Sequence, residues 1–144
     1  MAEWSLDIDK WCGKSKAKLD DVKRTFAFML YSAVVKKTPV DSGRARGNWN
    51  VSVGSPDYSV SDSTTPKVQD PSQMPKAPGD TAIYVANNLP YIKTLEFGGY
   101  PNPPKNPSGK TVNGYSKQAP QGMVGITVAK APYYLKKALD NAQG

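Results

Sequence analysis

Carboxylates and lysines are the side chains of this sequence that could carry chemistry, because it has no histidine and one cysteine, Cys12. Histidine is the commonest metal ligand and the usual general base. The acids are scattered without acid–base spacing, and there is no glycine-rich phosphate loop. We therefore expect no catalytic residue, cofactor or metal site. A carboxylate-only magnesium site, as in a metal-dependent nuclease, stays open.

Turn formers and arginines are concentrated in the segment TPVDSGRARGNW, residues 38–49. Asp41 opens an Asp-Ser-Gly turn, and Arg44 and Arg46 follow it as two guanidinium groups. Such groups suit carboxylates of a partner protein and phosphates equally well. We predict an interface role for Asp41, Arg44 and Arg46. The alternative is a helix-to-strand corner whose arginines are solvated, pair with Glu96, or stack on Trp49.

Aromatic residues surround a single carboxylate in the segment VANNLPYIKTLEFGG, residues 85–99. Glu96 stands between Leu95 and Phe97, and a carboxylate in apolar surroundings needs a cationic or backbone donor. Arg44 and Arg46 are the predicted cationic partners. Tyr91 and Phe97 of this segment, together with Trp49 and Tyr84 from outside it, form one of two things. They are either a stacking platform for single-stranded nucleic acid or, as their apolar neighbours favour, mostly core.

The net charge of +7 and the pI of 9.4 suit a polyanionic neighbour. Lys105, Lys110 and Lys117 lie in one segment without an acid, so they are candidates for contact with DNA; the alternative is a charge that only maintains solubility. Tyr133 and Tyr134, followed by two lysines, predict either an interface knob or simple helix packing.

A long first helix must position these groups. Apolar residues recur at steps of three and four from residue 6 to residue 37, and Pro39 ends the pattern. At 1.5 Å per residue this helix would extend about 48 Å, more than the width of a small domain. The alternative is a break at Gly13.

The rest of the 144-residue chain predicts a small sheet and a closing helix. Alternation of apolar and polar residues favours strands over 47–53 and 81–87. A short helix is expected over 91–97, after Pro90, and a last helix over 121–142 that Pro132 bends. Segments 54–80 and 99–118 predict mobile loops, the first as an arm or a partner-bound extension. We expect one α+β domain over residues 1–144, with two helices stacked on one face of an antiparallel sheet.

The lone cysteine indicates synthesis in a reducing compartment. No apolar run approaches the roughly 20 residues that span a bilayer. The first residues, acidic and amphipathic, do not have the pattern of a signal peptide. These features predict a cytoplasmic product without a membrane partner.

Four blocks of the sequence, in order, resemble the phage head–tail connector family known as tail completion, neck or minor tail protein Z-like proteins. The first is the long helix, and the second is TPVDSGRARGNW, similar to a TPVDTGxLRxSW pattern. The third is NNLPYIKTLEFG, similar to NNxPYxxxLExG, and the fourth is APQGMVGIT, similar to APxGMVxxT. The sequence departs from the pattern at Ala45, at Pro132 and in its long 54–80 segment.

This resemblance implies a structural virion protein at the head–tail junction of a long-tailed phage, made in the host cytoplasm. It would assemble as a homo-oligomeric ring, expected to be a hexamer, through which genomic DNA passes with non-specific contacts. Its partners would be the tail terminator or tail tube protein, the head-side stopper or adaptor, and the tape measure protein as a further candidate. The subunit and partner interface would use the predicted residues named above, namely Asp41, Arg44, Arg46, Trp49, Tyr91, Glu96, Phe97, Tyr133 and Tyr134.

Three other functions fit the residues. A small basic nucleic-acid-binding protein would bind DNA with a steep dependence on salt. A tail terminator or tube subunit is a near neighbour of the connector but usually has more continuous strand patterning. A metal-dependent phage enzyme would show turnover.

Overall fold

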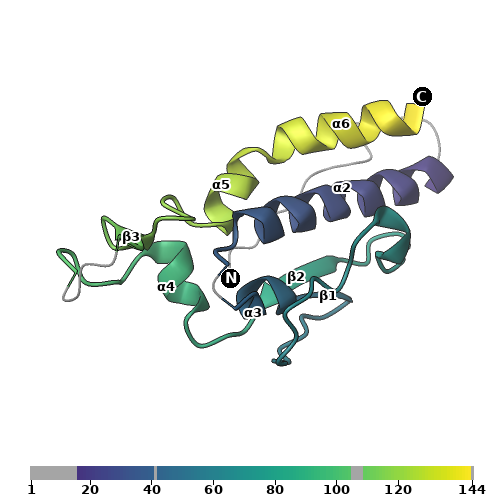
Figure 1. Cartoon of the computed structure of the whole chain (residues 1–144). Coiled ribbons are helices and arrows are strands. Elements are labelled where there is room, and N and C mark those ends of the chain that lie inside the picture. The colour runs from purple at the N-terminus through teal and green to yellow at the C-terminus, as the bar shows by residue number, and fades with distance from the viewer. Residues whose placement is uncertain (1–15, 41, 105–108, 144) are drawn as a thin grey trace.

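The computed structural model describes residues 16–40, 42–104 and 109–143, and its central element is helix α2, Lys16–Lys37 (Figure 1). The helix ends directly before Thr38-Pro39, as predicted, because the residue that precedes a proline disfavours the helical conformation. The predicted start near residue 6, and the alternative break at Gly13, lie outside the described residues.

Helix α2 is buried on two faces. Val22 and Phe26 belong to the apolar stripe that the sequence predicted, and they pack in one cluster with residues of the last helix. Tyr31, Val34 and Val35 form a second stripe that packs against the sheet side. Because both faces are covered, α2 lies in the middle of the molecule.

Strands β1, Trp49–Val53, and β2, Ile83–Asn87, form a two-stranded antiparallel sheet in which Trp49 is opposite Asn87 and Val53 is opposite Ile83. Both predicted strands are confirmed, each two residues shorter at its start. The first is shorter because Arg44–Gly47 form a helical turn, α3, that the sequence analysis did not predict.

Segment 54–80, predicted as a mobile arm or partner-bound extension, has a defined path along α2 and the sheet. Buried Val68, Met74 and Ala77 anchor it, with a 3-10 turn, η1, at Pro71–Gln73. From α2, Lys23 donates to the carbonyls of Ala77, Gly79 and Thr81, and Arg24 donates to those of Ser72 and Met74. Lysine and arginine thus satisfy a loop backbone that has few apolar residues of its own.

Helix α4, Ile92–Phe97, confirms the predicted short helix to within one residue. Segment 99–118, predicted as a mobile loop, contains a small hairpin of β3, Thr111–Val112, and β4, Tyr115–Ser116. Asn113 and Gly114 join its strands with φ of 51° and 87°. Positive φ at both loop residues is the conformation that Asn-Gly favours in tight hairpins.

The last predicted helix is two helices, α5 at Val124–Ala129 and α6 at Ala131–Gln143. The interruption falls at Lys130, two residues before Pro132, which the sequence predicted to bend the helix. Pro132 is the second residue of α6, within the first turn, where its missing N–H breaks no helical hydrogen bond.

Figure 1 shows these elements as layers, with α6 on one side of α2 and the β1–β2 sheet on the other. One hydrophobic cluster joins α2 to the sheet, α4 and the start of α5, and a second joins α2 to α6. The α+β class, with N-terminal and C-terminal helices and a small antiparallel sheet, is confirmed. The predicted stacking of both helices on one sheet face is corrected, because α6 packs on α2.

Candidate partner interface

The C-terminus of α2 is closed by residues from the TPVDSGRARGNW segment. Thr38 Oγ1 donates to Val34 O at 2.7 Å and accepts from Trp49 Nε1 at 2.9 Å. Arg46 Nε donates to Thr38 O at 2.8 Å, and its Nη2 donates to Lys36 O at 3.0 Å. A guanidinium at this end satisfies carbonyls that lack helical partners and opposes the helix dipole.

These contacts give Arg46 and Trp49 internal roles. Trp49 is 3% exposed, so its indole is core and is not available to a partner in this conformation. The predicted stacking of an arginine on Trp49 is not among the cation–π contacts of the described residues, where Lys137 lies over Tyr133. Arg46 therefore lies in a helix-to-strand corner, but its partners are the carbonyls at the end of α2 and not solvent, Glu96 or Trp49.

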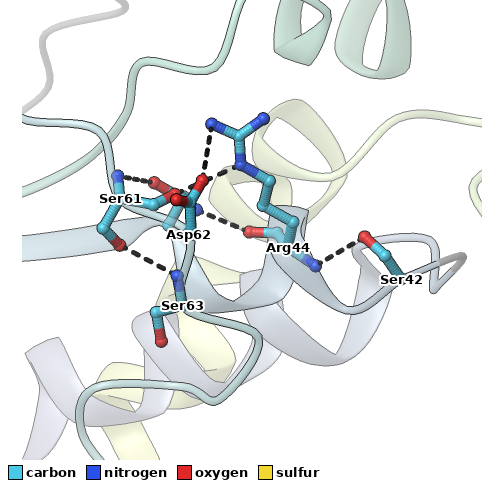
Figure 2. A network of polar contacts seen from close by, with 6 residues as sticks. Ser42, Arg44, Ser61, Asp62 and Ser63 are labelled. Atoms are coloured by element: carbon cyan, nitrogen blue, oxygen red, sulfur yellow. Dashed lines mark hydrogen bonds and ion pairs between the residues drawn. The ribbon is translucent and has the colours of Figure 1, made fainter.

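Arg44 points to a polar network that Figure 2 shows from close by. Its Nε donates to Ser61 O at 3.2 Å, and its Nη2 lies 3.6 Å from Asp62 Oδ1. Asn48 completes the network, since its Nδ2 donates to Arg44 O and Ser61 O and its Oδ1 accepts from Ser61 N. The Arg44 side chain remains 38% exposed, so it is still accessible to a partner. Asp41 lies outside the described residues.

Glu96 binds the start of α5. Its Oε1 accepts from Met123 N at 2.8 Å and Val124 N at 2.7 Å, and its Oε2 accepts from Gly125 N at 2.9 Å. The expectation of a donor partner is therefore met by backbone N–H groups, and the proposed pairing with Arg44 or Arg46 is wrong. A carboxylate at a helix start satisfies N–H groups that have no helical acceptor.

The remaining links connect the blocks to one another. Asn87 Nδ2 donates to Ala45 O at 2.9 Å. Gln118 and Val40 exchange two hydrogen bonds, at 2.8 Å through Val40 N and at 2.9 Å through Val40 O. The Asn87–Ala45 bond joins the second and third blocks, the Met123–Glu96 bond joins the third and fourth, and Gln118, which pairs with Val40, directly precedes the fourth block.

Several aromatic side chains remain on the surface. Phe97 is 73% exposed, Tyr133 59% and Tyr91 39%, so the expectation that Tyr91 and Phe97 are core is wrong. Tyr133 and Tyr134 contact edge-to-face with ring centroids 5.6 Å apart. These exposed rings, together with Arg44, are what remains available of the predicted interface.

Of the predicted DNA-contacting lysines, Lys110 and Lys117 directly flank the two strands of the β3–β4 hairpin. Lys110 and Lys117 are both exposed and are joined by a hydrogen bond from Lys117 N to Lys110 O at 2.9 Å. Lys105 lies outside the described residues.

A basic groove between α2 and α6 was missed by the sequence analysis. Its lining includes Lys36, Lys37 and Lys137, together with Phe28 and Tyr134. The signal was present in the paired lysines at the end of the first helix. It went unused because only the fold brings them beside the last helix.

Possible metal sites and membrane-spanning helices also bear on function. Among the residues that the structure describes, no three histidine, cysteine or acidic side chains gather as a metal site would require. None of the described helices is long and apolar enough to cross a bilayer.

Comparison with protein-family models, with curated proteins and with solved structures finds no match for this chain. The family resemblance therefore depends on the motif residues and on the contacts between them in the fold.

Proposed function

We propose that this chain is a structural protein of the neck of a long-tailed phage. Copies of it form a ring, expected to be a hexamer, between the head-side stopper or adaptor and the tail terminator or tube. DNA passes through the ring, and the chain performs no catalysis. A head-to-tail ring closes only when the rotation between subunits sums to a full turn.

The observation that carries this proposal is the convergence of the motif blocks. Asn87 with Ala45 and Glu96 with Met123 are hydrogen-bonded pairs that join different blocks resembling the family. Isolated motif matches would have no reason to meet in space. Residues that build one common fold are expected to meet in space, and this supports treating the blocks as one family signature.

The exposed aromatic side chains support an assembly role. A buried ring supplies much of the binding energy in protein interfaces, and Phe97 and Tyr133 are large rings that the isolated protomer leaves open to solvent. Scattered exposed apolar residues are common in monomers, so these two positions require a direct test.

Phe97→Ala and Tyr133→Ala should lower the yield of joined particles without unfolding the protomer, since exposed side chains contribute little to folding stability. Tyr58→Ala is the matched control, because Tyr58 is 72% exposed and lies in segment 54–80, outside the predicted interface. Particles assembled with each variant would be counted by electron microscopy, with circular dichroism as the check on folding.

Filled heads separated from finished tails are the expected product of the interface variants. Normal virions from both variants would contradict the assignment of Phe97 and Tyr133. Normal virions assembled with the chain absent altogether would contradict the connector function itself.

A further inference from the structure

Charge is distributed unevenly along the α2–α6 pair. The two helices run in opposite directions (Figure 1), and Val22 and Leu139 belong to the same hydrophobic cluster. Toward this end the pair carries both signs of charge, with Asp20 and Asp21 close in sequence to Lys23 and Arg24 on α2, and Asp140 on α6. The other end of the pair carries basic residues on both sides, namely Lys36, Lys37, Lys130 and Lys137.

These lysines meet at the groove between the helices. Lys36, Lys37 and Lys137 line it, and Lys130 is close enough to Lys37 to repel it electrostatically. Within the described part of the chain, none of the four is within ion-pair distance of a carboxylate; the one ion pair found there is Arg44–Asp62. The groove is therefore a concentration of positive charge without an internal counterion.

Keeping these charges together is unfavourable for the protomer. Partial burial lowers the pKa of Lys37, and the positive charges of Lys130 and Lys36 lower it further. Both effects disfavour the charged form at this position. An anion in the groove would relieve both the repulsion and the lost solvation.

We propose that this groove binds the phosphate backbone of double-stranded DNA without sequence preference. Its charged groups are all lysines, whose compact ammonium groups on flexible stems contact phosphates as point charges. Among the described residues no arginine lines the groove, so the groove lacks the paired donors that read a base edge. The lysines that line the groove suit a polyanion contacted through its charge.

This assignment differs from the one that the sequence predicted, in which Lys105, Lys110 and Lys117 contact DNA. It rests on the charge and packing of the helices and not on the connector role. A chain that failed to join heads to tails would leave it standing.

The test compares two triple variants with equal loss of charge. Lys36→Gln/Lys37→Gln/Lys130→Gln removes two lysines that line the groove together with Lys130, which lies near Lys37, whereas Lys76→Gln/Lys93→Gln/Lys136→Gln removes exposed lysines that do not line the groove. Lys137 is retained because its Nζ already lies 5.5 Å from the Tyr133 ring centroid. Fluorescence anisotropy with a short labelled DNA duplex would be measured over a series of salt concentrations, after circular dichroism has confirmed folding.

The groove variant should bind more weakly than wild type by at least about tenfold at low salt. Its plot of log affinity against log salt should be less steep by about 2–3, because each lost phosphate contact removes about 0.9. The control triple should retain more of the affinity at low salt and more of the salt dependence. Equal losses in the two triples would overturn the proposal, since binding would then follow net charge alone.

Two further outcomes would also overturn it. Lys110→Gln/Lys117→Gln could abolish binding while the groove variant retains it, which would assign DNA contact to the hairpin. Polyglutamate could bind through the three groove lysines more tightly than the duplex at the same salt, which would assign the groove to an acidic protein.

Discussion

Glu96 connects helix α4 to the start of α5 through three hydrogen bonds, to Met123 N, Val124 N and Gly125 N. The packing around it leaves little freedom, because a Cβ on Gly122 would stand 2.4 Å from Glu96 O. The backbone at Gly122 has φ of +80°, which also favours glycine. One carboxylate and one glycine therefore set how the closing helices leave the α4 region.

Glu96→Ala should lower the free energy of unfolding by about 2–3 kcal/mol, because it leaves several backbone N–H groups at the helix start without their charged acceptor. Urea denaturation measures the change. Glu96→Gln is the matched control, since the amide keeps one oxygen acceptor and should lose less. Equal stability of Glu96→Ala and wild type would contradict the capping role.

Arg46 changes its expected role once its contacts are known. The sequence alone predicted a partner-facing arginine, but its guanidinium binds the carbonyls of Thr38 and Lys36. Arg46→Glu should cost about 1–3 kcal/mol of stability, because it removes charge-assisted hydrogen bonds and puts a negative charge at a helix C-terminus.

Thermal or urea unfolding of Arg46→Glu would be compared with that of Arg44→Glu. The Arg44 side chain is 38% exposed, and its ion pair to Asp62 spans 3.6 Å. Arg44→Glu should therefore lower the free energy of unfolding by less than Arg46→Glu does, because exposed ion pairs usually contribute under about 1 kcal/mol. A larger loss at Arg44 than at Arg46 would show that the helix end is not held as described.

At the scale of elements, asparagine side chains hold segment 54–80 to the sheet. Asn50 Nδ2 donates to Asp57 O at 3.1 Å and Ser59 O at 2.8 Å, while Asn48 binds both N and O of Ser61. Buried asparagines that satisfy a neighbouring backbone replace the ladder that a third strand would supply. This explains why a segment so poor in apolar residues has a defined path.

Acid should weaken the turns at Asp57 and Asp70 in this segment. The pKa of Asp57 is lowered from its ordinary 3.8 by hydrogen bonds from the side chain and backbone of Ser59, and that of Asp70 is lowered from 3.8 by those of Ser72. A carboxylate whose pKa is lower in the folded state than in the unfolded state stabilises the fold at pH values above its unfolded pKa. This stabilisation is lost as the pH falls through its folded pKa.

Protease sensitivity of segment 54–80 should therefore rise as pH falls below about 3.8. Limited proteolysis with an acid-active protease, or hydrogen exchange, would measure it. The double variant Asp57→Asn/Asp70→Asn should flatten this dependence. An unchanged pH profile in that variant would contradict the role of the two aspartates.

The elements were predictable where local chemistry decides them. Pro39 ends α2, alternation marks β1 and β2, and the Asn113-Gly114 pair was an available hairpin signal that went unused. The break at Lys130 has a local cause in Pro132, which cannot donate to the carbonyl four residues earlier and clashes with it, so the preceding helix ends before the proline. The α3 turn was not predictable from periodicity, because it is four residues long.

The site was predictable to a smaller extent. A buried carboxylate needs a donor, so the requirement of Glu96 followed from its neighbours. Its donors are backbone groups 27 to 29 residues away, which no local pattern identifies. The exposure of Phe97 was missed for a similar reason, since apolar neighbours in sequence do not determine which side of a short helix is covered.

At the scale of the whole molecule, α2 is the common support. The sheet and segment 54–80 pack on it, α6 covers its other side, and the motif blocks close its C-terminal end (Figure 1). The basic groove and the exposed rings Phe97 and Tyr133 are then left as surfaces available to neighbours. This division between an internally satisfied framework and open charged and aromatic surfaces is what we expect of an assembly subunit.

The location of the chain in mature particles tests this account most directly. Gold-labelled antibody against the protein, imaged on whole virions by electron microscopy, should mark a ring at the junction of head and tail. Label at the distal tail tip or on fibres, or particles that contain none of the chain, would contradict the connector function.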